Sequence, residues 1–189
     1  NVVQNLLGEG TLSASVIPVY SEFLEEGREE DAGRFAGAVL GILMMVAGGA
    51  ALLGVLLAPV FVRLSFSLWD PDKQALTAIV VQILFPMTAV LVVSAWALAI
   101  LNSHRRFLVS YIAPVAWNGV IIMTLVAVGF GLGWSGRDLL VAAAWGALGG
   151  GILQLTVQLP LVVRLLKHFR LSLDRSVSGV GEAIRSFVP

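Results

Sequence analysis

Four long apolar runs, each closed at both ends by charged residues, constrain the fold of this chain more than any other feature. A helix needs about 20 mostly apolar residues to cross a hydrocarbon core of about 30 Å. All four runs are long enough, and they predict spans at residues 35–62, 75–102, 113–134 and 139–163. The sequence therefore predicts an all-α integral membrane protein, a polytopic transmembrane helix bundle.

Both ends of the chain predict further membrane structure. Residues 1–21 read as a span truncated at its start, and residues 176–189 turn apolar as a further helix would begin. No basic leader region precedes the first run. We expect this sequence to be a segment of a longer protein.

The composition also indicates a protein that lies in a lipid bilayer. Hydrophobic residues make up 58% of the chain, charged residues 13%, and the mean hydropathy is +0.91. Soluble domains are about 45–50% apolar and about 25% charged. The net charge of zero gives no indication of a nucleic-acid partner, and the lack of cysteine excludes disulfides, thiolate metal sites and thiol catalysis.

The basic residues of the short loops predict the orientation. The loops after the first, third and fifth spans carry Arg28, Arg34, Arg105, Arg106, Arg164, Lys167, Arg170 and Arg175, whereas the other side has only Arg63, Lys73 and Arg137. The richer side is predicted to be cytoplasmic. The loops "SLWDPDK" and "GWSGRD" would then be external, with Trp69 and Trp134 as interfacial anchors.

Small residues and prolines predict how the helices pack. Gly37 with Gly41, and Gly146 with Gly150, have the GxxxG spacing that lets helices approach closely, although glycine is also generally common in membrane helices. Pro86 should kink its helix without ending it, because packed neighbours satisfy the freed carbonyl. Pro114, a favoured first-turn residue, is expected near the start of the next helix.

Polar residues inside the spans are the candidate functional groups. They are Glu9, Gln82, Asn118, Gln154 and Gln158. An ionised group at the bilayer centre costs roughly 2.5–3.5 kcal/mol on insertion scales. Because of this cost, we predict that Glu9 has a function. It lies about 20 Å along its helix from Glu22, too deep to reach the surface. For the amides, interhelical hydrogen bonds are the favoured interpretation.

No enzymatic or metal-binding motif is present in the sequence. There is no Walker loop, HExxH or serine elbow. Asp70 and Asp72 flank a proline and read as a turn rather than a cation site. The run "SHRRF", with His104, Arg105 and Arg106, reads as a cytoplasmic anchor rather than a phosphate-handling site, and no metal site is predicted.

Several motifs, in order, resemble one known family. "NLLGEGTLSASVIPVYSEF" is similar to its NLL…EG…S…P segment, "ILFPM" to its kinked FP helix, and "AILNSHRRF" to its ILN…RF loop, while "APVAWN" and "GGGILQLTVQLP" continue the series. These motifs resemble the MviN/MurJ lipid II flippases of the multidrug/oligosaccharidyl-lipid/polysaccharide exporter superfamily. The resemblance covers essentially the whole chain.

The resemblance implies a fold and an activity. The complete family protein has fourteen transmembrane helices in two lobes, and this chain would supply late helix 2 to the start of helix 7, part of the N-terminal lobe. Such proteins move an undecaprenyl-diphosphate-linked peptidoglycan precursor across the bacterial cytoplasmic (inner) membrane by alternating access. The resemblance implies no cofactor, with energy from H⁺, Na⁺ or the membrane potential, and it adds cell-wall synthesis proteins as partners.

The resemblance also assigns roles to individual residues. Glu9 and Ser13 match motif positions beside the substrate cavity or gate, and Pro18 matches the motif proline. Gln4, with Asn5, stands where many members carry an arginine pair that includes a cavity arginine. Arg106 matches the arginine of the RF loop. Two alternatives stay open: another polyprenyl-linked oligosaccharide flippase or cation-coupled exporter of the superfamily, and a membrane-embedded polyprenyl-diphosphate phosphatase.

Overall fold

The computed structural model describes the backbone of residues 9–187 and the side chains of residues 15–185. Its elements are the helices α2 (Glu9–Glu25), α3 (Glu29–Ser65), α4 (Pro71–Ser103), α5 (Phe107–Val126), η1 (Ala127–Gly131), α6 (Gly136–Leu165) and α7 (Val180–Phe187). No strand occurs among the described residues. The all-α prediction is therefore confirmed.

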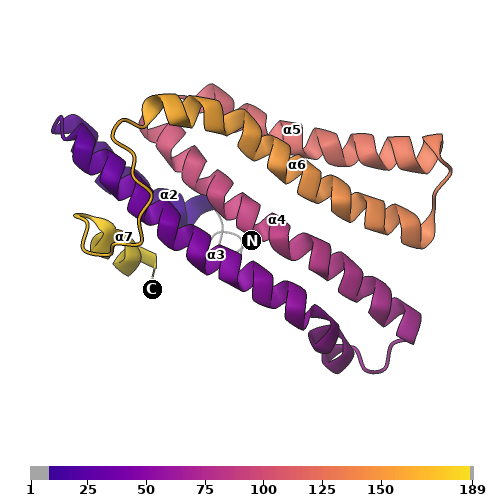
Figure 1. Ribbon diagram of the computed structural model, residues 1–189. Coiled ribbons are helices and arrows are strands. Elements are labelled where there is room, and N and C mark those ends of the chain that lie inside the picture. The colour runs from indigo at the N-terminus through magenta and orange to yellow at the C-terminus, as the bar shows by residue number, and fades with distance from the viewer. Residues whose placement is uncertain (1–8, 188–189) are drawn as a thin grey trace.

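The long helices lie side by side in the order α3, α4, α6, α5 (Figure 1). This order differs from the chain order because α6 packs between α4 and α5. Helices α2 and α7 pack at one end of the bundle, where the α2–α3 and α4–α5 turns and the end of α6 also lie. We call this the basic end, since its loops carry most of the basic residues.

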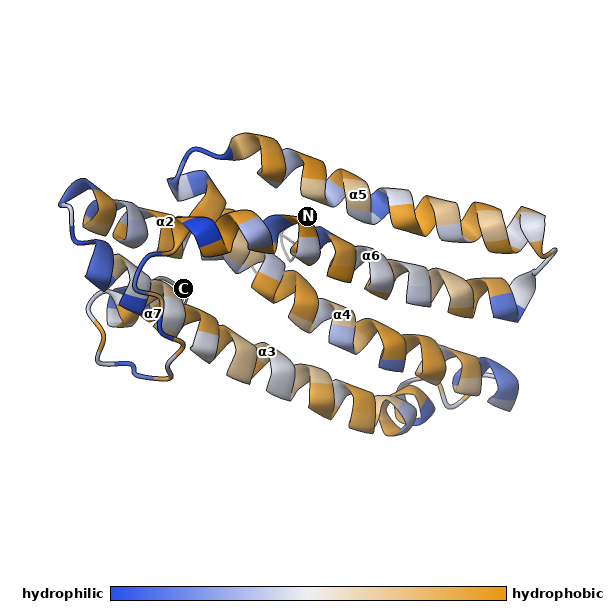
Figure 2. Cartoon of the chain, turned by 45° about the horizontal axis from the view of Figure 1, so that its top comes forward, coloured by the Kyte–Doolittle hydropathy of each residue, from blue (hydrophilic) through white to orange (hydrophobic). Residues whose placement is uncertain are grey.

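Among the described residues, four helical segments are long and apolar enough to cross a membrane: α3, α4, α5 with η1 (Phe107–Gly131), and α6. Their surfaces are mostly hydrophobic along their lengths, and polar residues concentrate toward the ends (Figure 2). The chain is a multi-pass membrane protein. Helix α2 has 17 described residues, so the predicted span at residues 1–21 lies partly outside the described part of the chain.

Local sequence explains where the helices end. At the end of α4, Arg105 has a positive φ of 57°, and the Arg106 N–H donates to the Leu101 carbonyl at 2.8 Å. Gly27, with φ 73°, ends α2 in the same way. Both are Schellman-type caps, which satisfy carbonyls at a helix end. Asp70 caps the start of α4 by accepting a hydrogen bond from the Asp72 N–H at 2.9 Å.

The start of α5 was predicted incorrectly. The helix was expected to begin near Pro114, but it begins at Phe107 and continues through Pro114. A proline inside a membrane helix is tolerated when neighbours or side chains satisfy the freed backbone group. Proline alone was therefore a poor marker of this helix start.

The buried core lies toward the basic end. Its largest fully buried side chains include Tyr20, Phe35 and Trp96, which come from α2, α3 and α4. The Trp96 indole N–H donates to the Ala36 carbonyl at 3.1 Å, which ties α4 to α3. This end holds the helices together by both apolar contact and hydrogen bonds.

Residues 166–179, which connect α6 to α7, form a non-helical strap along α3. The carbonyls of Lys167, Arg170 and Ser172 occupy the positions where a Cβ would project from Gly33, Gly37 and Gly41, respectively. The prediction that Gly37 and Gly41 mark a helix–helix contact is therefore wrong. These glycines accept the backbone of the strap instead, an approach that a side chain would block.

Candidate functional site

A polar pocket at the basic end is formed by four elements. Tyr20 lies near the end of α2, Glu29 begins α3, His104 follows α4, and Lys167 follows α6. With Leu24, Ala32, Arg164 and Leu165, they line a cavity of about 270 Å³. We call it the basic-end pocket. The two helix caps at Gly27 and Arg105 position Glu29 and His104 at its edge, because they turn the chain directly beside these residues.

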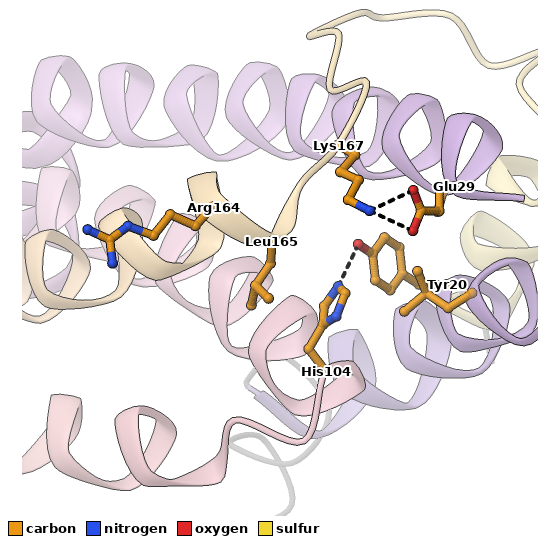
Figure 3. Close-up of a pocket in the computed structure, with 8 residues that line it drawn as sticks. Tyr20, Glu29, His104, Arg164, Leu165 and Lys167 are labelled. Carbon is orange, nitrogen blue, oxygen red and sulfur yellow. Dashed lines mark hydrogen bonds and ion pairs between the residues drawn. The ribbon is translucent and has the colours of Figure 1, made fainter. Parts of the chain in front are cut away.

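Two polar pairs cross this pocket (Figure 3). The Tyr20 Oη and His104 Nε2 are 3.1 Å apart, and their rings meet edge to face at 5.7 Å. The Lys167 Nζ lies 2.9 and 3.0 Å from the two carboxylate oxygens of Glu29. Arg164 points away from these four side chains. The pairs join α2 to α4 and α3 to the strap.

The environment of His104 favours its neutral form. Burial lowers the His104 pKa below 6.5, the nearby Arg106 charge lowers it further, and Glu29 partly opposes both effects. A neutral imidazole with an unprotonated Nε2 can accept a hydrogen bond from the Tyr20 hydroxyl there. The pocket thus combines a hydrogen-bonded neutral histidine with a partly exposed ion pair.

The basic-end pocket does not have the residues of a metal site. No group of three or more His, Cys, Asp or Glu residues able to hold a metal ion occurs in the described part of the chain. What the pocket can do is bind water or a small polar group and hold four chain elements together. The sequence does not reveal this cluster because its members lie in four separate segments: it singles out His104 as a possible chemical group and Lys167 only as a loop charge.

A second polar site lies between α4 and α6. The Ser94 hydroxyl donates to Gln158 Oε1 at 2.8 Å, and Gln154 Nε2 donates to Ser94 Oγ at 2.7 Å. All three residues are buried. Within the described chain, Gln154 Oε1 and Gln158 Nε2 have no hydrogen-bond partner. The sequence indicated the two glutamines but not Ser94, because a helical serine can also bond its own backbone.

The remaining intramembrane amides have different partners. Gln82 Nε2 donates to the Val55 carbonyl of α3 at 3.0 Å, an interhelical bond. Asn118 Nδ2 instead donates to the Pro114 carbonyl of its own helix at 3.0 Å. The expectation of an interhelical bond is wrong for Asn118, because a carbonyl one turn earlier is available.

The predicted cavity residues lie at the start of the chain. Gln4 lies outside the described residues, and Glu9 and Ser13 lie in α2 with side chains outside the described part. Their placement beside a cavity therefore stays a prediction. Pro18 and Pro86 lie inside α2 and α4, and both helices continue past them.

The glycines of α6 lie against α5. A Cβ at Gly146 would lie 2.8 Å from Thr124 Oγ1, and one at Gly150 would lie 2.8 Å from the Trp117 carbonyl oxygen. The Trp117 indole N–H donates to the Ala147 carbonyl at 2.9 Å in the same contact. This face of α6 therefore packs directly on α5, against the Thr124 side chain at Gly146 and against the Trp117 backbone at Gly150.

Arg105 and Arg106 form the turn after α4, on the basic end. Both are exposed, and no ion pair of either is present among the described residues. They contribute to the positive charge of this end, and the Arg106 charge also lowers the pKa of His104.

Comparisons with known proteins give one consistent family. The family model described as "Lipid II flippase MurJ" matches residues 1–189. The chain is 28% identical to "Probable lipid II flippase MurJ" of Rhizobium meliloti (strain 1021), over 83% of this chain and 30% of the relative. It is 27% identical to "Lipid II flippase MurJ" of Burkholderia cenocepacia, over 85% of this chain and 31% of the relative.

A further relative matches along the whole chain. "Probable lipid II flippase MurJ" of Treponema pallidum (strain Nichols) is 26% identical over 100% of this chain and 35% of the relative. The chain thus spans about a third of the length of the curated relatives it matches.

Proposed function

The chain belongs to the MurJ family of lipid II flippases, and on that premise we propose that the complete protein moves lipid II across the bacterial cytoplasmic membrane. The match over residues 1–189 is the observation that carries this proposal. The relatives bear the name lipid II flippase, and we infer the activity of the complete protein from this sequence similarity. The protein would act as a transporter rather than an enzyme.

The geometry is compatible with one lobe of an alternating-access transporter. Its buried core, the hydrogen bonds of Tyr20 and Trp96 and the Glu29–Lys167 ion pair lie toward the basic end, so we take this end as the rigid base of the bundle. Glu9 lies at the opposite end of α2 from Tyr20, about 16 Å away at 1.5 Å per residue. A lobe held at its base can move as a unit while cavity residues near its middle change partners.

The substrate and its energy source complete the proposal. The headgroup of lipid II carries a diphosphate, which basic residues elsewhere in the complete protein would bind, while Glu9 would act as a gate or as a coupling carboxylate. The coupling energy would come from H⁺, Na⁺ or the membrane potential. Cell-wall synthesis proteins are the expected further partners, because they use the flipped lipid.

A complementation experiment tests this function. The complete protein is expressed in a bacterium depleted of its own lipid II flippase, and growth and the lipid II exposed on the outer leaflet are measured. The proposal predicts restored growth and restored exposure. Full-length expression without either result would contradict it, and rescue of a strain lacking a different polyprenyl-linked oligosaccharide flippase would support the alternative substrate.

A further inference from the structure

An open groove lies between the strap and α3. Its volume is about 570 Å³, within the range of small-molecule sites, and it is lined by Gly41, Met44, Met45, Leu171, Ser172 and Leu173. Both methionines and both leucines are about half exposed, between 48% and 57%. The groove therefore presents an apolar surface that nothing in the described chain covers.

The position of this groove relative to the bilayer follows from α3. Large apolar side chains are exposed along α3 from Met44 to Leu64. This interval is about 30 Å at 1.5 Å per residue, which matches the thickness of a hydrocarbon core. The residues of α3 from Ala32 to Gly41 are instead mostly buried. The groove thus begins at the boundary where the lipid-facing part of α3 starts.

The backbone of the strap supports the same boundary. The strap is not helical, and non-helical backbone does not face lipid tails within the hydrocarbon, because its polar groups would lack partners. Its Ser172 N–H is close to the Gly37 carbonyl, at 3.4 Å. The strap therefore lies at the level of the lipid headgroups, with Leu171 and Leu173 beside the first acyl carbons.

The strap also carries positive charge. It contains Lys167, Arg170 and Arg175 against the single acid Asp174. Lys167 pairs with Glu29, whereas no ion pair of Arg170 or Arg175 is found in the described part of the chain. Hydrogen bonds from Ser176 lower the Asp174 pKa, so Asp174 stays ionised and offsets one arginine. One positive charge on the strap remains unmatched.

We propose that this groove is a binding site for one anionic phospholipid of the surrounding leaflet. One acyl chain lies along Met44, Met45 and Leu173, and the phosphate lies beside Arg170 and Arg175. Basic residues beside membrane helices attract anionic headgroups by about 1 kcal/mol each, and the apolar groove holds the chain. The bound lipid would hold the strap against α3.

A binding experiment on the complete protein tests the headgroup. Delipidated protein is titrated with phosphatidylglycerol or phosphatidylcholine, and bound lipid is counted by native mass spectrometry. R170Q/R175Q should weaken phosphatidylglycerol binding by roughly 10- to 30-fold. The matched control R105Q/R106Q removes the same charge from the same end of the bundle and should leave this binding unchanged. Equal losses in the two variants, or equal binding of the two lipids, would overturn the proposal.

A crosslinking experiment tests the acyl chain. Phosphatidylglycerol with a photoreactive acyl chain should label the peptide that contains Met44 and Met45, and M45W should abolish this labelling by filling the groove. L56W, at another exposed position on α3, is the control and should retain it. If the Met45 peptide stays unlabelled in the wild type while Leu56 is labelled, another part of the longer protein covers the groove and the proposal fails. Labelling by a polyprenyl diphosphate in preference to phosphatidylglycerol would overturn it as well.

Discussion

Tyr20 and His104 are 84 positions apart in the chain, yet the Tyr20 hydroxyl lies 3.1 Å from His104 Nε2. The bond joins α2 to the end of α4 at the basic end. It fixes the end of α2 that is remote from Glu9. The end of α2 that carries Glu9 is thus positioned through a contact that the sequence did not indicate.

Acidification should destabilise the protein through His104. Its pKa is lowered in the folded state by burial and by Arg106, so the unfolded chain binds a proton first as the pH falls below 6.5. The stabilisation that comes from neutral His104 is then fully present above pH 6.5. It is lost as the pH falls from there toward the lowered pKa of the folded state. Thermal unfolding in detergent at several pH values measures this loss.

The variant His104→Gln isolates this effect. Glutamine can accept the Tyr20 hydroxyl bond but does not titrate, so stability should depend less on pH in this window. His168→Gln removes the other histidine and should preserve the His104 contribution. An unchanged pH dependence in His104→Gln would show that other groups cause it.

Adding one methyl group at Gly150 should loosen the α5–α6 contact. The new Cβ would lie 2.8 Å from the Trp117 carbonyl oxygen, and backbone cannot move aside cheaply. Gly150→Ala should therefore cost about 1–3 kcal/mol, as overpacking does. The control is Gly149→Ala, where no atom lies within 4 Å of the new Cβ, and alanine should be neutral or stabilising there. Equal unfolding temperatures for the two variants would contradict the packing described here.

Removing Ser94 should be more harmful than removing its whole network. Ser94→Ala leaves Gln154 and Gln158 buried without their shared partner, which should cost about 1–2 kcal/mol. The triple variant S94A/Q154L/Q158L removes every polar side chain of this network, so it should recover most of that loss. The free energies of unfolding of S94A, Q154L and Q158L, of their double combinations and of the triple variant measure the coupling between the three residues. Strictly additive losses would mean that the three residues act independently.

The sequence predicted the fold class and the membrane helices because hydrophobic length is a strong local signal. It also indicated Gln154 and Gln158, since amides inside a span need partners. It did not predict the basic-end pocket, because Tyr20, Glu29 and Lys167 are ordinary residues until tertiary contacts bring them to His104. The glycine spacing at Gly37 was misassigned for a related reason. GxxxG indicates close approach but does not say whether the partner is a helix or an extended strap.

Glu9 should be essential for transport in the complete protein. Glu9→Ala should abolish complementation without preventing insertion, because it removes the carboxylate and leaves the span apolar. Glu9→Gln separates two roles: a hydrogen-bonded gate would partly survive it, whereas an ion-coupled carboxylate would not. Glu22→Ala, on the exposed end of the same helix, is the matched control and should complement normally. Full complementation by Glu9→Ala would exclude a functional role for this carboxylate.

Translocation of lipid II by the purified complete protein is the most direct measure of the proposed flippase activity. Vesicles with fluorescent lipid II are treated with a membrane-impermeant quencher, and the rate at which inner-leaflet lipid becomes accessible is measured with and without the protein. We expect a rate well above that of protein-free vesicles, lowered toward that background by Glu9→Ala. A rate equal to background in vesicles that contain folded, inserted protein would contradict it.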